Sequence, residues 1–163
     1  MHISYLKEAE ARQLIERPVK DFTLRYEPDA VQRVLDLTRC HPFLVQLLCA
    51  KIVVLKNEQD PSIRRLATLA DVEEAVPQAL SSGSFFFADI QNNQVNFDGL
   101  EILRFLAAQG EAAIASQEAL SRKFPDNLDS TLDLLLRREL IEQVGDRYRF
   151  QVELIRRWFA KAR

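Results

Sequence analysis

Cys40 and His41 are adjacent in the sequence, and a thiol beside an imidazole is the first residue pair that offers chemistry. In an enzyme with a cysteine nucleophile, a histidine deprotonates the thiol and a third group orients the histidine. Side chains of consecutive residues usually point apart, and the sequence shows no evident third group. We therefore expect no catalysis from this pair, and we predict that the chain by itself is not an enzyme.

Motifs that hold phosphate or metal are missing from the sequence. Neither the P-loop spacing G-x-x-x-x-G-K-[ST] nor G-x-G-x-x-G occurs, and the chain has only 4 glycines. The 2 cysteines and 2 histidines do not have the spacing of a zinc site. We therefore predict no metal site and no cofactor for this chain alone.

The composition is that of an ordinary soluble protein, with 47% hydrophobic and 28% charged residues and a net charge of −2. This balance excludes a globally basic nucleic-acid binder. The most apolar stretch, residues 43–55, contains Gln46 and Lys51 and is too short to span a bilayer. We expect no membrane partner, and the few cysteines together with the lack of a signal segment favour a reduced, cytoplasmic setting.

Proline positions and apolar spacing predict a helical bundle in residues 1–80. Pro28 and Pro42 each stand where a helix begins, because the first turn of a helix leaves the missing N–H without a cost. The helix after Pro42 is apolar on more than one face, so we expect it at the centre of the bundle. Thr68, three residues before Asp71, predicts a capping box, and Pro77 falls near the expected end of that helix.

Residues 81–95 are the expected linker, because Ser81-Ser82-Gly83-Ser84 weakens every local preference and helical spacing resumes only near Phe97. The following Phe85-Phe86-Phe87 is interpreted as an aromatic clip that packs the linker onto one unit. An exposed interaction patch is the alternative.

Residues 96–163 have the element order of a winged helix. A helix after Phe97, a short strand at 112–114 and two further helices precede two β-like runs around Gly145-Asp146, which is a hairpin signal. The predicted fold class is therefore mainly α, with a helical bundle followed by a winged helix that carries a short β-hairpin.

A winged helix raises the possibility of DNA binding, because its third helix often enters the major groove. Here Asp126, Asp129 and Asp133 would repel phosphates. Residues 137–163 nevertheless hold eight basic and four acidic side chains, a local charge of +4. The alternative function is a DNA-binding winged-helix transcription regulator, in which a basic strip contacts DNA. The strip consists of Arg147, Arg149, Arg156 and Arg157. A solvated rim or a contact with an acidic partner is the simpler interpretation, so DNA binding is disfavoured.

Three segments resemble one protein family: Leu14–Val19 with its L-I-x-x-P pattern, the run Leu37–Cys49, and Tyr148–Trp158. The chain resembles the region of bacterial STAND-type AAA+ ATPases that follows the P-loop core, a helical lid and then a winged helix. That family often shows threonine-glycine-glycine-histidine-proline leading into an apolar helix, and Thr38–Pro42 is similar to it.

The resemblance implies that His41 and Pro42 lie at the nucleotide edge of the lid. Pro42 suits this position because it begins a helix whose amino end favours anions, and its ring can pack on a base. Cys40 stands where the family has glycine, so a left-handed backbone there would be strained.

The resemblance also implies a function and partners. The chain is expected to be the regulatory C-terminal region of an ATPase, in which the lid contacts nucleotide and the winged helix relays the nucleotide state. Its expected partners are an upstream P-loop NTPase core and a protein effector or a second copy of itself. ATP or ADP would be bound by the full-length protein rather than by this chain alone.

Overall fold

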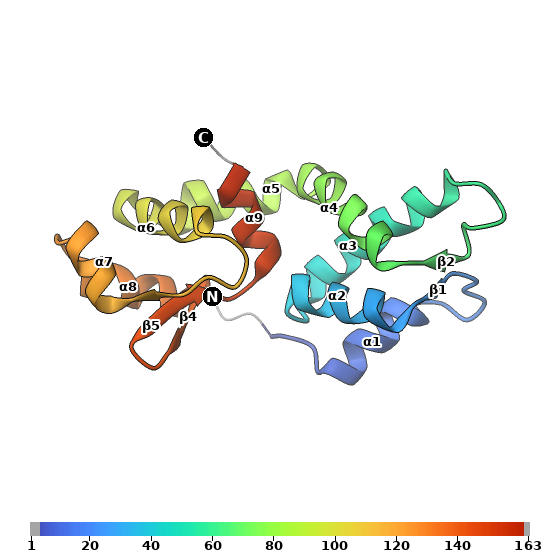
Figure 1. Ribbon diagram of the computed structural model, residues 1–163, viewed down its shortest axis with the longest axis horizontal. Helices are drawn as coiled ribbons and strands as arrows, with labels where there is room; N and C mark the ends of the chain where they lie inside the picture. Colours follow the sequence, from blue (N-terminus) through green and yellow to red (C-terminus); the bar gives the residue numbers. More distant parts are fainter. Residues whose placement is uncertain (1–3, 162–163) are drawn as a thin grey trace. The chain divides into compact units, whose positions relative to one another are not determined.

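The computed structural model describes residues 4–161 and is mainly α-helical, as the sequence predicts (Figure 1). The chain divides into two compact units, a helical unit of Ser4–Gly83 and a second unit that begins at Ser84. Within the described range, no helix combines the length and apolar character needed to cross a membrane.

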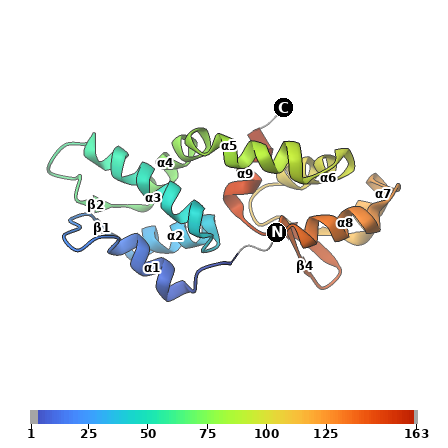
Figure 2. The ribbon, with the colours of Figure 1, turned by 180° about the vertical axis from the view of Figure 1, so that it is seen from behind.

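The helical unit contains four helices and a two-stranded parallel sheet among its described residues. Strand β1 pairs with β2 so that Arg25 lies opposite Leu66 and Tyr26 opposite Ala67, and both views show the strands side by side (Figure 2). The elements are α1 Glu8–Glu16, β1 Arg25–Tyr26, α2 Pro28–Thr38, α3 Pro42–Asn57, β2 Leu66–Ala67 and α4 Leu69–Ser82.

Helix α3 forms the core of this unit, as the apolar pattern after Pro42 predicts. Leu44, Val45, Leu48 and Ile52 are completely buried, and α3 packs against α1, α2 and α4. These buried side chains share one face of α3, whereas Phe43 and Val54 on the opposite face are 44% and 49% exposed. The burial of that one face stabilises the unit.

The capping box predicted at the start of α4 is confirmed. Thr68 Oγ1 accepts the Asp71 N–H at 3.3 Å, and an Asp71 carboxylate oxygen accepts the Thr68 N–H at 2.9 Å. The expectation that α4 ends near Pro77 is wrong, because α4 continues to Ser82. Buried neighbours before and after the proline, among them Val76, hold the backbone helical in spite of the lost N–H.

A buried ion pair joins the last turn of α3 to the first turn of α4. Lys56 Nζ donates to Asp71 Oδ2 at 2.8 Å, and the two side chains are only 3% and 9% exposed. Gln59 donates to the other carboxylate oxygen at 3.0 Å. Burial by itself would raise the pKa of Asp71, but the hydrogen bonds from Lys56, Gln59 and Thr68 outweigh it and lower this pKa to about 2.

The linker expected at residues 81–95 is not an irregular segment. After Gly83 the chain forms α5, Ser84–Asp89, and then a turn of π-helix, η1, Ile90–Gln94. The reason is packing: Phe87 is fully buried and stacks on Trp158 with ring centroids 5.4 Å apart. Phe87 is therefore an aromatic clip within the second unit, whereas Phe85 is 92% exposed.

The second unit has the winged-helix topology. Its three-stranded antiparallel sheet has the order β3-β5-β4, and the hairpin turns at Gly145, whose φ is +64°, as predicted. The first strand lies at Ala115–Ser116 rather than at 112–114, because Ala112 adopts a left-handed turn conformation with φ +60°. The remaining elements are α6 Phe97–Ala108, α7 Gln117–Lys123, α8 Leu128–Arg137, β4 Ile141–Val144, β5 Arg147–Phe150 and α9 Glu153–Lys161.

Because the pKa of Asp71 is lowered in the folded state, the free energy of unfolding of the helical unit depends on pH in the acidic range. The Lys56 pair stabilises the fold above the unfolded-state pKa of an aspartate and is lost as the pH falls through the folded-state value of about 2. We predict that between pH 5 and pH 2 the wild-type protein loses about 2 kcal/mol more unfolding free energy than Asp71→Asn does. Urea unfolding at each pH measures this difference. If the unfolding free energies of the two proteins fall by the same amount between pH 5 and pH 2, the prediction is contradicted.

Candidate functional site

The candidate site is the turn between α2 and α3, which contains the predicted residues His41 and Pro42. Helix α2 ends at Thr38, whose hydroxyl donates to the Val34 carbonyl at 2.8 Å. Arg39 and Cys40 then both adopt the left-handed conformation, with φ values of +53° and +61°. A side chain in this conformation costs about 1–2 kcal/mol relative to a right-handed one, so two in succession form a strained reversal.

Backbone hydrogen bonds close the strained turn on both sides. The His41 N–H donates to the Thr38 carbonyl at 3.0 Å, which carries the chain directly from one helix to the next. The Leu6 N–H donates to the Cys40 carbonyl at 2.9 Å, so the segment before α1 is fixed to the turn. The turn therefore determines both the start of α3 and the position of the amino-terminal segment.

His41 is buried and caps α3. It is 5% exposed, its Nδ1 accepts the Leu44 N–H at 3.4 Å, and its ring meets Tyr5 edge-on at a centroid distance of 5.8 Å. The turn presents to solvent the exposed Arg39, the partly exposed Pro42, and Phe43, which is 44% exposed. His41 is thus buried beneath the start of α3, whereas Pro42 is accessible from solvent.

The start of α3 and the neighbouring Cys40 thiol have different electrostatic surroundings. The first turn of α3 contains no acidic residue, so the partial positive charge at its amino end is not compensated there. Burial and the Glu8 carboxylate raise the pKa of the Cys40 thiol, although Arg39 and Arg12 act in the opposite direction. The raised pKa disfavours the reactive thiolate form of Cys40.

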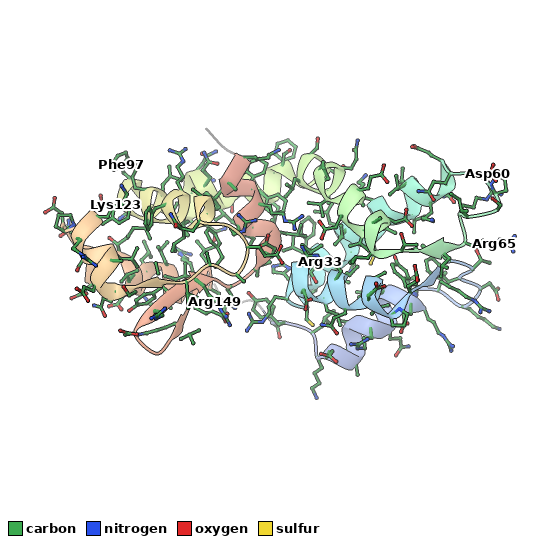
Figure 3. The ribbon with its side chains drawn as sticks, in the orientation of Figure 1. Arg33, Asp60, Arg65, Phe97, Lys123 and Arg149 are labelled. Carbon is green, nitrogen blue, oxygen red and sulfur yellow. The ribbon has the colours of Figure 1, made fainter. Side chains whose placement is uncertain are left out.

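The four arginines of the DNA-binding alternative lie on the winged-helix unit, and three of them form internal ion pairs. Arg149 Nε donates to Glu142 at 2.7 Å across the hairpin, where Figure 3 labels it. Arg156 and Arg157 donate to Glu153 at 2.7 Å and 2.9 Å. The remaining member of the expected strip, Arg147, is exposed on the hairpin.

One of these arginines also holds the unit together. Arg156 donates a further hydrogen bond of 2.8 Å to the Ala107 carbonyl, which joins α9 to the last turn of α6. Its side chain is only 12% exposed. Sequence analysis missed these pairs, although the spacing of Glu153 three and four residues before the two arginines is an ordinary helical ion-pair signal.

Comparison with known proteins adds no family assignment. No protein-family model matches the chain, and no curated protein sequence is significantly similar to it. The resemblance to ATPase lid regions therefore rests on the residues quoted in the sequence analysis, and any function for the α2–α3 turn is a proposal.

The strained backbone at Cys40 predicts an unusual ranking of substitutions. Cys40→Gly should stabilise the protein by about 0.5–1 kcal/mol relative to Cys40→Ala, because glycine adopts a positive φ without a steric cost. Cys40→Val should be less stable than Cys40→Ala by about 1–2 kcal/mol, because a β-branched side chain tolerates a positive φ least. Urea unfolding of the three variants measures the ranking. The alanine variant controls for loss of the thiol, and a glycine variant less stable than the alanine variant would contradict the strain.

Proposed function

We propose that this chain is the regulatory region that follows the P-loop core of a STAND-type AAA+ ATPase. In this proposal the helical unit is the lid, and the winged-helix unit relays the nucleotide state to a protein effector. The observation that carries the proposal is the pair of left-handed residues, Arg39 and Cys40, directly before His41-Pro42. These are the two positions at which the resembling family has glycine, the residue that favours this conformation.

The proposal assigns different roles to the neighbouring residues of the turn. Pro42 is the contact residue, because it is partly exposed at the start of α3, where anions are favoured and its rigid ring can pack on a base. His41 is a positioning residue, because it is buried and its Nδ1 accepts the Leu44 N–H. The phosphate-binding groups would come from the P-loop core, since this sequence has no such motif.

Charge on the winged-helix unit supports a protein effector rather than DNA. Helix α8, which follows α6 and α7 as the third helix of the winged-helix motif, exposes Asp129 and Asp133, which would repel phosphates in a major groove. Arg149, Arg156 and Arg157 are held by carboxylates of the same unit, so releasing them to DNA would break existing ion pairs. No specific contact in the described residues favours the transcription-regulator alternative.

The proposal predicts bound nucleotide in the natural gene product but not in this chain alone. An affinity tag fused to the 3′ end of the chromosomal gene allows the product to be purified with any upstream core. We expect about one adenine nucleotide per protein molecule, measured by chromatography after acid extraction. The isolated chain should bind ATP more weakly than micromolar, which corresponds to about −8 kcal/mol, and should not hydrolyse it.

Two results would contradict this proposal. One is a tagged gene product that carries neither nucleotide nor an associated P-loop protein. The other is a sequence-specific DNA complex of this chain that survives about 0.2 M salt, because non-specific phosphate contacts weaken steeply at that concentration. The second result would favour the DNA-binding alternative instead.

A further inference from the structure

Three arginines without carboxylate partners gather where β1 and β2 meet. Arg25 lies on β1, and Arg64 and Arg65 lie in the turn that leads into β2, with the Arg25 N–H bonded to the Arg65 carbonyl at 2.8 Å. All three are exposed, and within residues 4–161 no ion pair links them to an acidic side chain. By contrast, Arg33 of the same unit is paired with Glu73.

A mainly apolar hollow of about 580 Å³ lies between these strands and the end of α3. Arg25 and Arg65 line it together with two exposed apolar residues, Ile63 and Leu66, whose exposed fractions are 55% and 46%. Figure 3 labels Arg65 and Asp60 on this loop. We call this surface the arginine hollow.

The floor of the arginine hollow is electrically neutral and is held rigidly. Lys56 and Asp71 both line it, and their 2.8 Å ion pair cancels the two charges. Gln59 also lines it, and its buried carbonyl oxygen Oε1 has no hydrogen-bond donor among the described residues. The positive charge of the hollow therefore comes from its arginine rim.

This surface is separate from the proposed nucleotide edge. Lys56 follows His41 by fifteen residues along α3, which is about 22 Å along a helix axis. A ligand at Pro42 therefore does not reach the arginine hollow. Binding at the arginine hollow therefore does not depend on nucleotide binding at Pro42.

We propose that the arginine hollow binds an acidic peptide segment of a partner protein, with an apolar side chain of that segment between Ile63 and Leu66. Arginine binds carboxylates through two parallel hydrogen bonds and is enriched in protein interfaces. A small ligand fits less well, because the walls are largely exposed and small-molecule sites bury most of their ligand. Nucleic acid also fits less well, because the hollow is lined mainly by apolar surface, whereas nucleic-acid binding rests on charged and polar contacts to phosphates.

Fluorescence anisotropy with a short synthetic peptide of alternating glutamate and leucine tests this proposal on the chain as it stands. We expect the double variant Arg25→Gln, Arg65→Gln to bind this peptide at least about tenfold more weakly than the wild type. Arg147→Gln, which removes an exposed arginine from the other unit, is the matched control and should bind like the wild type. Replacing leucine by serine in the peptide should also weaken binding, because the apolar contact is lost.

Reversing the charge of the two arginines distinguishes loss of charge from a structural defect, because a misfolded variant would not gain affinity for a new peptide. Arg25→Glu with Arg65→Glu should acquire affinity for a lysine-leucine peptide that the wild type does not bind. Thermal melts by circular dichroism check that the variants fold. The proposal is overturned if the double variant binds the glutamate-leucine peptide as the wild type does, or if Arg147→Gln weakens binding equally. It is also overturned if the hollow binds only a DNA duplex or a second copy of the chain.

Discussion

The left-handed pair Arg39 and Cys40 is the constraint on which the helical unit depends. It reverses the chain between α2 and α3 without an intervening loop, so α3 begins at Pro42 and runs through the centre of the unit. The same turn receives the Leu6 N–H, and His41 packs edge-on against Tyr5. The two left-handed residues are conformationally unfavourable, but the turn they form fixes the start of α3 and holds the segment that precedes α1.

The two ends of α3 are fixed by different physical means. At its start, backbone geometry and the His41 cap set the direction of the helix. At its end, Lys56 forms a buried ion pair with Asp71, which connects α3 to the capping box of α4. Removing one partner from such a pair leaves an uncompensated buried charge and costs about 3–5 kcal/mol. A rigid core helix held at both ends gives each end a defined surface, Pro42 at one end and the arginine hollow at the other.

Local signals predicted much of the fold, and contacts between distant residues account for what they missed. Pro42, the Thr68 capping box and the Gly145 turn act within a few residues, so their effects are visible in the sequence. The helices at 84–94 escaped prediction because Gly83 and its serines suggest a break, while the burial of Phe87 against Trp158 overrides that preference.

In the candidate site, too, contacts between residues distant in the sequence could not be predicted from local patterns. His41 and Pro42 were singled out by the resemblance to ATPase lid regions, but the burial of His41 against Tyr5, far away in sequence, has no local signal. The Lys56 and Asp71 pair spans fifteen residues and has no local signal. The arginine hollow likewise forms only because β1 pairs with β2, forty residues further along the chain.

Photoaffinity labelling of the full gene product with 2-azido-ADP tests the central claim most directly, because this reagent attaches to residues that contact adenine. Trypsin cleaves after Arg39 and after Lys51, so the peptide 40–51 carries Pro42 and separates it from the rest of the chain. The proposed role of the turn predicts that this peptide carries the label and loses it when unlabelled ADP competes. Labelling confined to other peptides, with residues 40–51 unmodified, would contradict it.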